Sequence, residues 1–315
     1  MKSEKLFQGY DVGFLSDDSN QLPVPLPQLN EFQKNDLAIN ENSENIIKYI
    51  NYSLQLSKSH KFPYYTATNI DGKLFQKVPR KDNWRKDNRI SKNFQWGPEL
   101  YKSPKGDFDK GHMTKREDVQ WGDTIGIALN AADSTFFYTN AVPQHKDLNR
   151  FIWRSLEDYI LHTETKKNSL KISVFTGPVL SYNNPYFVNQ IKNVSIQLPI
   201  LFWKIVIFPK DDGKLYRVGF MMCQNSLLEK DGIIEELESS SSDETLFMQF
   251  KDADTYQVNI SLIEELSGII IPSAIDSYID RRNTKLILNE IDIDPDLESG
   301  NIEQKLGFLI QNIVL

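Results

Sequence analysis

Three short clusters hold the side chains best suited to chemistry. The first is DKGH, residues 109–112, and the second is TNAVPQHKDLN, residues 139–149. The third is the segment that follows, which carries Asn149, Trp153 and Glu157. Each cluster has an ordinary structural explanation when it is taken alone. A histidine after glycine is common in turns, asparagine is a preferred helix cap, and a glutamate on a helix is usually solvated.

Taken together, the clusters contain the parts that hydrolysis of a phosphodiester requires. The neutral imidazole of His112 suits a general base, because its unperturbed pKa of about 6.5 lies near neutral pH. A hard ion such as Mg²⁺ prefers oxygen ligands and keeps several waters, so the side-chain oxygen of Asn149 can suffice to hold it. The cationic residues that precede His112 would neutralise charge on the phosphate.

The spacing of Asn149 and Glu157 separates their roles. Eight residues on a helix span about 12 Å along its axis at ~1.5 Å per residue, and the two directions differ by only about 80°. The two side chains share a helix face but do not easily touch one ion. We therefore expect Asn149 to be the direct ligand and Glu157 to act through water or by orienting the site.

Alternating and β-branched runs predict the strands that position these residues. Residues 49–57 alternate apolar with polar side chains, which predicts a half-buried strand, and residues 63–70 form a second strand rich in Tyr and Thr. The run STFFYTNAV, residues 134–142, is β-branched and aromatic and predicts another strand. Three later strands are expected at residues 171–180, 201–208 and 214–224.

Helices and loops account for the remaining segments. Residues 147–163 have near-helical apolar spacing, and shorter helices are expected at 261–266 and in the tail, where Ile302, Leu306, Leu309 and Ile313 form one stripe. Residues 77–108 are polar and predict a long, functional surface loop, and residues 236–246 predict an acidic low-complexity loop. We infer an α+β fold with an extended arm at 1–44, one domain at 45–285 and a tail at 286–315.

Composition and charge exclude several classes of protein. The chain has 315 residues, one cysteine (Cys223, expected to be a buried small hydrophobe) and four histidines, which excludes a disulfide framework and a cysteine-rich zinc site. No apolar signal region and no membrane span are apparent, so a cytoplasmic protein is expected, with export by a route without a cleavable signal as the alternative. The net charge is −7, yet residues 77–116 hold twelve Lys or Arg and five Asp or Glu. Residues 229–300 hold eighteen acidic and five basic residues.

The spaced motifs together resemble the DNA/RNA non-specific endonuclease family, the ββα-metal nucleases. The family signature Asp-Arg-Gly-His is similar to DKGH at 109–112, and its second signature is similar to the set Asn140, Pro143, Gln144, Asn149, Trp153 and Glu157. An upstream family segment resembles VPRKDNWRKDNRI, with Arg80, Trp84 and Asp87. The similarity covers about residues 45–275. It implies a central antiparallel sheet with flanking helices and long loops.

The resemblance also implies a role for each residue of the site. His112 would be the general base, Arg80 would stabilise charge on the phosphate, and Glu157 would assist the metal site. Asn149 would hold Mg²⁺, for which Mn²⁺ is the expected substitute. Asp109 would support the site, as would Asn140 and Gln144.

Lys110 departs from the family signature, which has arginine there. Lysine keeps the positive charge but lacks the two-pronged grip on phosphate, so contact with substrate is also expected from Lys115, Arg116 and Arg85. A catalytically weak nucleic-acid-binding or interaction module of the same fold therefore stays open as the alternative. His145 is expected to have a structural role more readily than a catalytic one.

The expected partners follow from a site that binds phosphate. Such a site reads no base edges, so DNA and RNA are the expected substrates, bound through their backbones without sequence specificity. An intracellular nuclease would threaten its host, which favours a regulatory protein or inhibitor as a further partner, and a homodimer is a further alternative.

Overall fold

The structure, a computed structural model, describes most of the chain. The described residues are 8–106, 108–149, 156–157, 160, 165, 170–235, 250, 254–280, 282–286, 288–292, 306–310 and 313–314.

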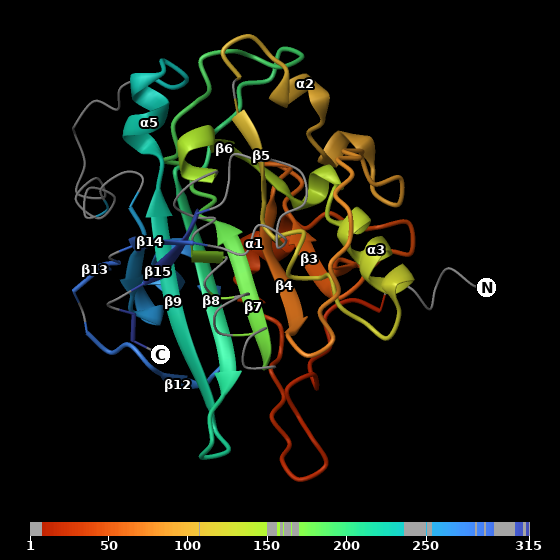
Figure 1. Ribbon diagram of the computed structural model, residues 1–315. Coiled ribbons are helices and arrows are strands. Elements are labelled where there is room, and N and C mark those ends of the chain that lie inside the picture. The colour runs from red at the N-terminus through yellow and green to blue at the C-terminus, as the bar shows by residue number, and fades with distance from the viewer. Residues whose placement is uncertain are drawn as a thin grey trace.

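A large, mainly antiparallel sheet forms the centre of the molecule (Figure 1). Within the described residues it holds nine strands in the order β13-β10-β9-β8-β7-β4-β3-β2, with β12 joined to β9 in parallel. The bounds of the strands are Ile47–Lys48 (β2), Tyr52–Leu56 (β3), Pro63–Asp71 (β4), Lys171–Pro178 (β7), Leu201–Pro209 (β8), Leu215–Cys223 (β9), Tyr256–Val258 (β10), Ile275–Asp276 (β12) and Thr284–Lys285 (β13).

The central strands are apolar because both of their faces are covered. Strand β8 runs as LFWKIVIFP, and its first seven residues are buried. Its neighbours in the sheet are β7, where Phe175 pairs with Ile205, and β9, where Gly219 pairs with the same residue. A strand buried on both faces loses the alternation of apolar and polar residues, which explains why this run reads as continuous.

The helices are short and lie around the sheet (Figure 1). Their bounds are Glu31–Asn35 (α1), Pro98–Tyr101 (α2), Ile125–Ser134 (α3), Asn225–Lys230 (α5) and Ile260–Ser267 (α7), with single turns at Lys92–Phe94 and Tyr138–Asn140. The Thr124 side chain caps α3 at its start. Asn259 caps α7, which ends at Gly268 with a left-handed φ of 67°. None of these described helices has the length and apolar character needed to cross a bilayer.

Three two-stranded sheets complete the fold. The first joins β5 (Phe108–His112) to β6 (Ala141–His145) and carries the DKGH motif. The second joins β1 (Gln28–Leu29) to β11 (Ile269–Ile270), so the N-terminal segment lies beside a distant part of the chain. The third joins β14 (Leu288–Asp292) to β15 (Leu306–Ile310).

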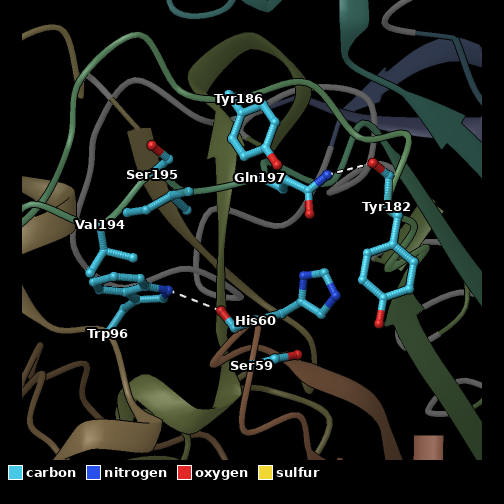
Figure 2. Close-up of a pocket in the computed structure, with 9 residues that line it drawn as sticks. Ser59, His60, Trp96, Tyr182, Tyr186, Val194, Ser195 and Gln197 are labelled. Atoms are coloured by element: carbon cyan, nitrogen blue, oxygen red, sulfur yellow. Dashed lines mark hydrogen bonds between the residues drawn. The ribbon is translucent and has the colours of Figure 1, made fainter. Parts of the chain in front are cut away.

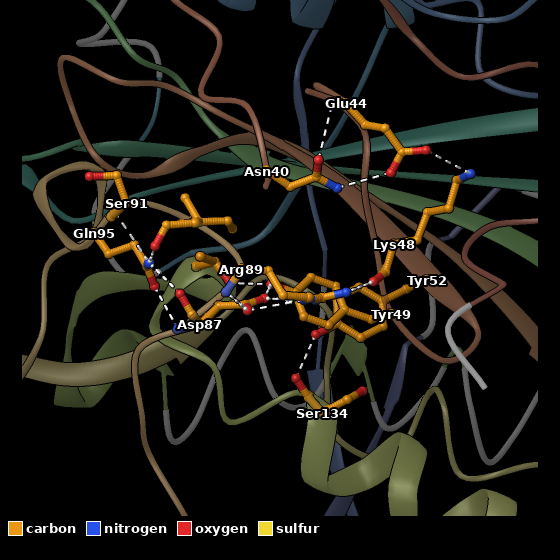
Figure 3. A network of polar contacts seen from close by, with 12 residues as sticks. Asn40, Glu44, Lys48, Tyr49, Tyr52, Asp87, Arg89, Ser91, Gln95 and Ser134 are labelled. Carbon is orange, nitrogen blue, oxygen red and sulfur yellow. Dashed lines mark hydrogen bonds and ion pairs between the residues drawn. The ribbon is translucent and has the colours of Figure 1, made fainter. Parts of the chain in front are cut away.

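The long polar segment 77–108 is held in place by buried side chains. The Trp96 indole donates to the His60 carbonyl at 3.0 Å, which fastens the segment to the turn between β3 and β4 (Figure 2). Further back, the Asp87 carboxylate is 2 % exposed, pairs with Arg89 at 2.7 Å and accepts from the Tyr49 hydroxyl at 2.8 Å (Figure 3). Gln95 adds hydrogen bonds to the backbone of Asp87 in both directions. A long loop therefore has a defined path.

The predicted fold class is confirmed, and several predicted elements are found where they were expected. These are the strands β4, β7, β8 and β9, helix α7 and the irregular segment before β5. The described residues of the predicted helix 147–163 are helical. The loop predicted at 236–246 lies outside the described residues. The proposed domain boundaries stay a prediction.

Three of the expectations were wrong. Residues 134–142 are mainly the end of α3 and a turn, and the strand begins only at Ala141. Strand β3 is buried on both faces rather than half-buried. Its apolar side chains lie in a hydrophobic cluster, and its polar side chains are covered, with Ser53 accepting from the Tyr10 N–H and Gln55 from the Tyr65 hydroxyl. In the tail, residues 306–310 form β15 instead of a helix, because their backbone pairs with β14.

Candidate active site

The site is built on the β5–β6 pair. His112 ends β5 and pairs with Ala141, while Asp109 pairs with Gln144. Side chains alternate across a strand, so Lys110 and His112 lie on one face of β5 and Asp109 lies on the other. The pairing fixes where each side chain of the motif points.

Gly111 allows the two strands to approach. A Cβ at this position would overlap the Gln144 side chain, whose Cγ lies 2.5 Å from that point. Gln144 is fully buried, so its side chain has little room to move away. The glycine of the motif is therefore needed for packing, and its neighbour His112 owes its position to it.

The His112 ring lies among aromatic side chains. Its centroid is 4.7 Å from that of Trp84 and 5.2 Å from that of Phe136, the latter in an edge-on arrangement. The ring as a whole is half-buried, but Nε2 is covered and has no hydrogen-bond partner among the described residues. A buried polar atom without a partner is uncommon in folded proteins, so this nitrogen is a candidate for contact with water or substrate.

Cations surround the same imidazole. Burial lowers the pKa of His112 to about 3, and the positive charge of Arg80 acts in the same direction. Asp82 opposes this shift, while Arg116 and Lys110 lower the pKa by smaller amounts. The imidazole is therefore neutral at pH 7 and able to accept a proton.

Arg80 and Lys110 reach this region from different elements. Arg80 is exposed and pairs with Asp82 at 2.7 Å. Although burial opposes it, the hydrogen bond and the charge of Arg80, with a smaller effect of the Lys110 charge, lower the pKa of Asp82. The Lys110 Nζ lies 5.7 Å from the Trp84 ring centroid, on the side of β5 that also carries His112. The structure thus brings two predicted cations, Arg80 of the upstream segment and Lys110 of the DKGH motif, to the predicted base.

Asn149 is connected to the motif through Asp109. Its Nδ2 donates to Asp109 Oδ2 at 3.0 Å, and Asn149 is the last of the helical residues 146–149. This bond fixes the orientation of the amide and leaves its oxygen, Oδ1, as the atom for a cation. No group of three or more His, Cys, Asp or Glu side chains suited to a metal occurs in the described part of the chain. The donors therefore fit a hard ion that keeps most of its waters, and they do not fit a zinc site.

Glu157 lies in a buried group of charges. Its side chain is 9 % exposed, and Oε1 is 3.1 Å from Nζ of Lys204, which is 1 % exposed and also donates to Thr176 at 3.0 Å. Burial raises the pKa of the neighbouring Asp118 to about 7 against the opposing charge of Lys204, and Glu157 raises it further. The structure records no contact between Glu157 and Asn149 within the described residues, in keeping with separate roles.

Asn140 and His145 stabilise the two ends of β6. The buried Asn140 amide accepts from the Thr114 N–H at 2.8 Å and donates to the Thr114 carbonyl at 2.9 Å, so it holds the turn that follows His112. His145 is 2 % exposed, and its Nε2 lies 2.9 Å from Asp231 Oδ2. Through these contacts both residues stabilise the structure around β6. For His145 this agrees with the structural role that the sequence favoured over a catalytic one.

Two residues predicted to contact phosphate, Arg85 and Lys115, form ion pairs with carboxylates of this chain. Arg85 pairs with Asp133 of α3 at 2.5 Å, and its guanidinium lies 4.1 Å above the Phe137 ring. Lys115 lies 3.2 Å from Glu117, with both side chains largely covered. Nothing in the described contacts brings either residue to His112, and their roles stay predictions.

Sequence reasoning missed the partners of the predicted residues. Asp82 and Phe136 were not singled out, and neither were Lys204 and Asp118. Lys204 had a usable signal, since a single lysine in the apolar run LFWKIVIF requires a buried partner. Asp82 had none, because it lies among many charges in a polar segment.

The structure has a known fold. It is similar to a crystal structure of the EndoG/EndoGI complex, with a TM-score of 0.52 and 18% identity over 72% of this chain and 85% of that one. This similarity confirms the ββα-metal fold.

Comparison of sequences leads to the family. The chain is 29% identical to the uncharacterized protein y4fB of Sinorhizobium fredii, 28% to a nuclease of Nostoc and 28% to mitochondrial endonuclease G of Bos taurus, over 86%, 51% and 36% of its own length. It spans 40%, 54% and 38% of the lengths of these relatives. The profile of the DNA/RNA non-specific endonucleases matches residues 30–277. The chain therefore belongs to the DNA/RNA non-specific endonuclease family.

Proposed function

We propose that this protein is a metal-dependent endonuclease that hydrolyses phosphodiester bonds in DNA and RNA without reading the base sequence. The observation that carries the proposal is the His112 imidazole, whose Nε2 is covered and lacks a partner in the described structure while three cations lie around the ring. A neutral base among cations suits attack of water on an anionic phosphate.

In the proposed reaction, His112 Nε2 takes a proton from water as the water oxygen bonds to phosphorus. The bond from phosphorus to the leaving sugar oxygen breaks, and that oxygen takes up a proton from solvent. Arg80 and Lys110 stabilise the negative charge that grows on the phosphate oxygens. Lysine gives this charge without the paired hydrogen bonds of arginine.

Asn149 would hold the metal through Oδ1, with Asp109 fixing the amide and Glu157 acting through water. When bound, Mg²⁺, or Mn²⁺ in its place, would neutralise charge on the phosphate and the leaving oxygen. Both the ion and these residue roles are part of the proposal.

Cleavage assays test the proposal directly. Purified protein is incubated with supercoiled plasmid and with RNA, in Mg²⁺, in Mn²⁺ and in chelator, beside His112→Ala and Asn149→Ala. We expect cleavage of both polymers by the wild type with metal, loss by roughly 100-fold or more in His112→Ala, and a raised metal requirement in Asn149→Ala. Asn42→Ala, at an exposed asparagine far along the chain from the site, is the matched control.

The outcomes separate the competing functions. A wild type that binds nucleic acid but does not cut it with any metal would favour the catalytically weak binding module. Equal cleavage by His112→Ala would rule out His112 as the base.

Regulation by an inhibitor protein is a further part of the proposal. It is supported by the similar solved structure, which is a complex of EndoG with EndoGI that concerns EndoG inhibition. An inhibitor with an acidic surface would compete with phosphate for the cations around His112, so its effect should weaken as salt rises. A homodimer stays a prediction.

A further inference from the structure

A cavity of about 160 Å³, whose lining does not include His112, is drawn in Figure 2. Three stretches of chain form it, namely the β3–β4 turn, the segment around Trp96 and the loop 182–197. Four aromatic rings line it: His60, Trp96, Tyr182 and Tyr186. The proposed reaction uses none of them.

Two of these rings, those of Tyr182 and Tyr186, are unusually open to solvent for residues that only support a fold, whereas Trp96 is buried. Tyr182 is 72% exposed and Tyr186 is 58% exposed. The Tyr182 ring lies 6.1 Å from that of His60 and 6.4 Å from that of Phe32, which is 72% exposed as well. Grouped exposed aromatic side chains mark a binding surface more often than a structural one.

Lysines give the same surface a positive charge. The Lys61 Nζ lies 4.2 Å above the Trp96 ring, and Lys192, 72% exposed, adjoins the lining residues of the loop. Burial and the charges of Lys86 and Lys192 lower the pKa of Lys61, which shows that the three cations lie within reach of one another. A close acid, Glu99, pairs with Lys86 at 2.7 Å and lies 3.6 Å from Lys192. Asp36, which accepts from the lining residue Ser59, is a second carboxylate close to the cavity, so three lysines stand beside two carboxylates in these contacts.

A chain of ring contacts connects the cavity region with the catalytic histidine. Trp84 contacts His112 and, at 5.6 Å, Tyr138, which stacks on Tyr101 of α2 at 5.7 Å. Helix α2 also holds Glu99, the residue between the cavity lysines. The loop 182–197 packs on the catalytic strand itself, since Phe187 and Phe108 have ring centroids 5.2 Å apart. The cavity region and the strand that carries His112 thus belong to elements that pack against one another.

We propose that this cavity binds a base of single-stranded nucleic acid, a few nucleotides from the phosphate at His112. The base would stack on the exposed tyrosines, and the lysines would contact the adjoining phosphates. Aromatic rings beside cations form the usual surface for single strands, because every base has a face that stacks. The inference rests on the proposed function and adds to it a substrate contact that depends on bases but not on their identity.

Binding to two matched probes tests the inference. The protein carries His112→Ala and is kept in chelator, so that cleavage does not interfere. Its affinity is measured by fluorescence anisotropy for a short oligothymidylate and for an abasic oligonucleotide of the same length. Tyr182→Ala combined with Tyr186→Ala should weaken binding of the oligothymidylate by about 5- to 100-fold and leave the abasic probe unchanged.

Two further variants complete the test. Lys192→Ala should weaken binding of both probes, because phosphates are common to them. Ile279→Ala, at a side chain that is 78% exposed and outside the cavity, should change neither. The side chains substituted on the His112→Ala background, those of Tyr182, Tyr186, Lys192 and Ile279, are well exposed, so these variants should fold as the starting protein does.

The results distinguish this inference from the proposed function. If the wild type cuts plasmid but the tyrosine variant binds both probes as before, the inference is overturned while the nuclease stands. Equal weakening of both probes, or no binding of either by the starting protein, also overturns it. Selective loss of the base-bearing probe supports it, whether or not the wild type proves to be a nuclease.

Discussion

At the scale of single residues, the site depends on a histidine that its surroundings keep neutral. Burial and three nearby cations both disfavour the imidazolium form of His112. The same cations suit an anionic substrate, whose arrival would reduce their net charge and make the imidazole a stronger base. Under the proposed function, binding of phosphate would thus favour uptake of a proton by His112.

The first prediction concerns how the rate depends on pH. A pKa of about 3 keeps His112 unprotonated well into acid, so kcat/KM should hold at and below about pH 6.5, where an ordinary histidine is half protonated. Arg80→Gln removes one positive charge, which raises this pKa and moves the acid limb to higher pH. The measurement is kcat/KM against pH for a labelled oligonucleotide at saturating Mg²⁺. A wild-type acid limb at about 6.5 that Arg80→Gln does not move would contradict it.

The second prediction concerns the glycine of the motif. Gly111→Ala should destabilise the protein by about 1–3 kcal/mol, because the new methyl group overlaps the buried Gln144 side chain. Adding Gln144→Ala should recover part of this loss. Thermal unfolding followed by circular dichroism measures both changes.

A second glycine serves as the control. Gly126 lies in helix α3, and a Cβ there would meet only Thr124 Oγ1 at 3.8 Å. Gly126→Ala should therefore leave stability unchanged or raise it by up to about 1 kcal/mol. Destabilisation of both variants to the same extent would show that the overlap at Gly111 is not the cause.

At the scale of elements, the sequence predicts best where one physical demand dominates. Strands β7, β8 and β9 are covered on both faces, so their apolar runs have one simple explanation. The run at 134–142 has the composition of a strand, yet Phe136 is used against Trp84 and His112 in a turn. Tertiary contacts decide such cases, and local propensity does not record them.

The same contrast holds within the site. The chemical groups of His112 and Asn149 could be recognised from residue types and spacing. Their partners could not, because the ion pair of Glu157 with Lys204 joins a helix to a strand 47 positions further along the chain. In the tail, the spacing of Leu306 and Leu309 predicts a helix, but these residues form a strand because their backbone pairs with β14. This pairing is not visible in the local sequence.

The third prediction concerns this buried ion pair. Lys204→Met leaves Glu157 and Asp118 without their buried cation, which should cost about 3–5 kcal/mol of stability at alkaline pH. The raised pKa of Asp118, about 7, means that the folded protein keeps a proton there that the unfolded chain has already released above about pH 4. The contribution of Asp118 to the free energy of unfolding therefore falls as pH rises toward 7. The loss of stability caused by removing Lys204 should grow over the same range.

Urea denaturation at about pH 5 and about pH 8 measures the effect. Lys214→Met is the control, because Lys214 is 65% exposed and its nearest carboxylate oxygen is 4.0 Å away. A loss in Lys204→Met that is no larger at the higher pH would mean that the carboxylates do not depend on this lysine.

At the scale of the whole molecule, an acidic protein contains one strongly basic segment. The net charge is −7, while residues 77–116 carry +7 within that total, so the rest of the chain carries −14. Nucleic acid should thus be repelled by most of the molecule and attracted by one segment. The segment has a fixed path, through the Asp87–Arg89 pair and the Trp96 hydrogen bond (Figures 2 and 3).

The fourth prediction follows from this uneven charge. Binding of DNA by the His112→Ala protein in chelator should weaken steeply with salt, because each contact between a phosphate and a cation releases counterions. Arg80→Ala and Lys110→Ala should each reduce the slope of log affinity against log salt by about 1, and Lys214→Ala should leave it unchanged. Equal reductions in all three variants would mean that the overall field attracts the substrate and that no segment holds it. A slope that changes only in the Arg80 and Lys110 variants would instead mean that this acidic molecule binds nucleic acid through contacts beside His112, the proposed general base. Binding and cleavage would then use the same cations.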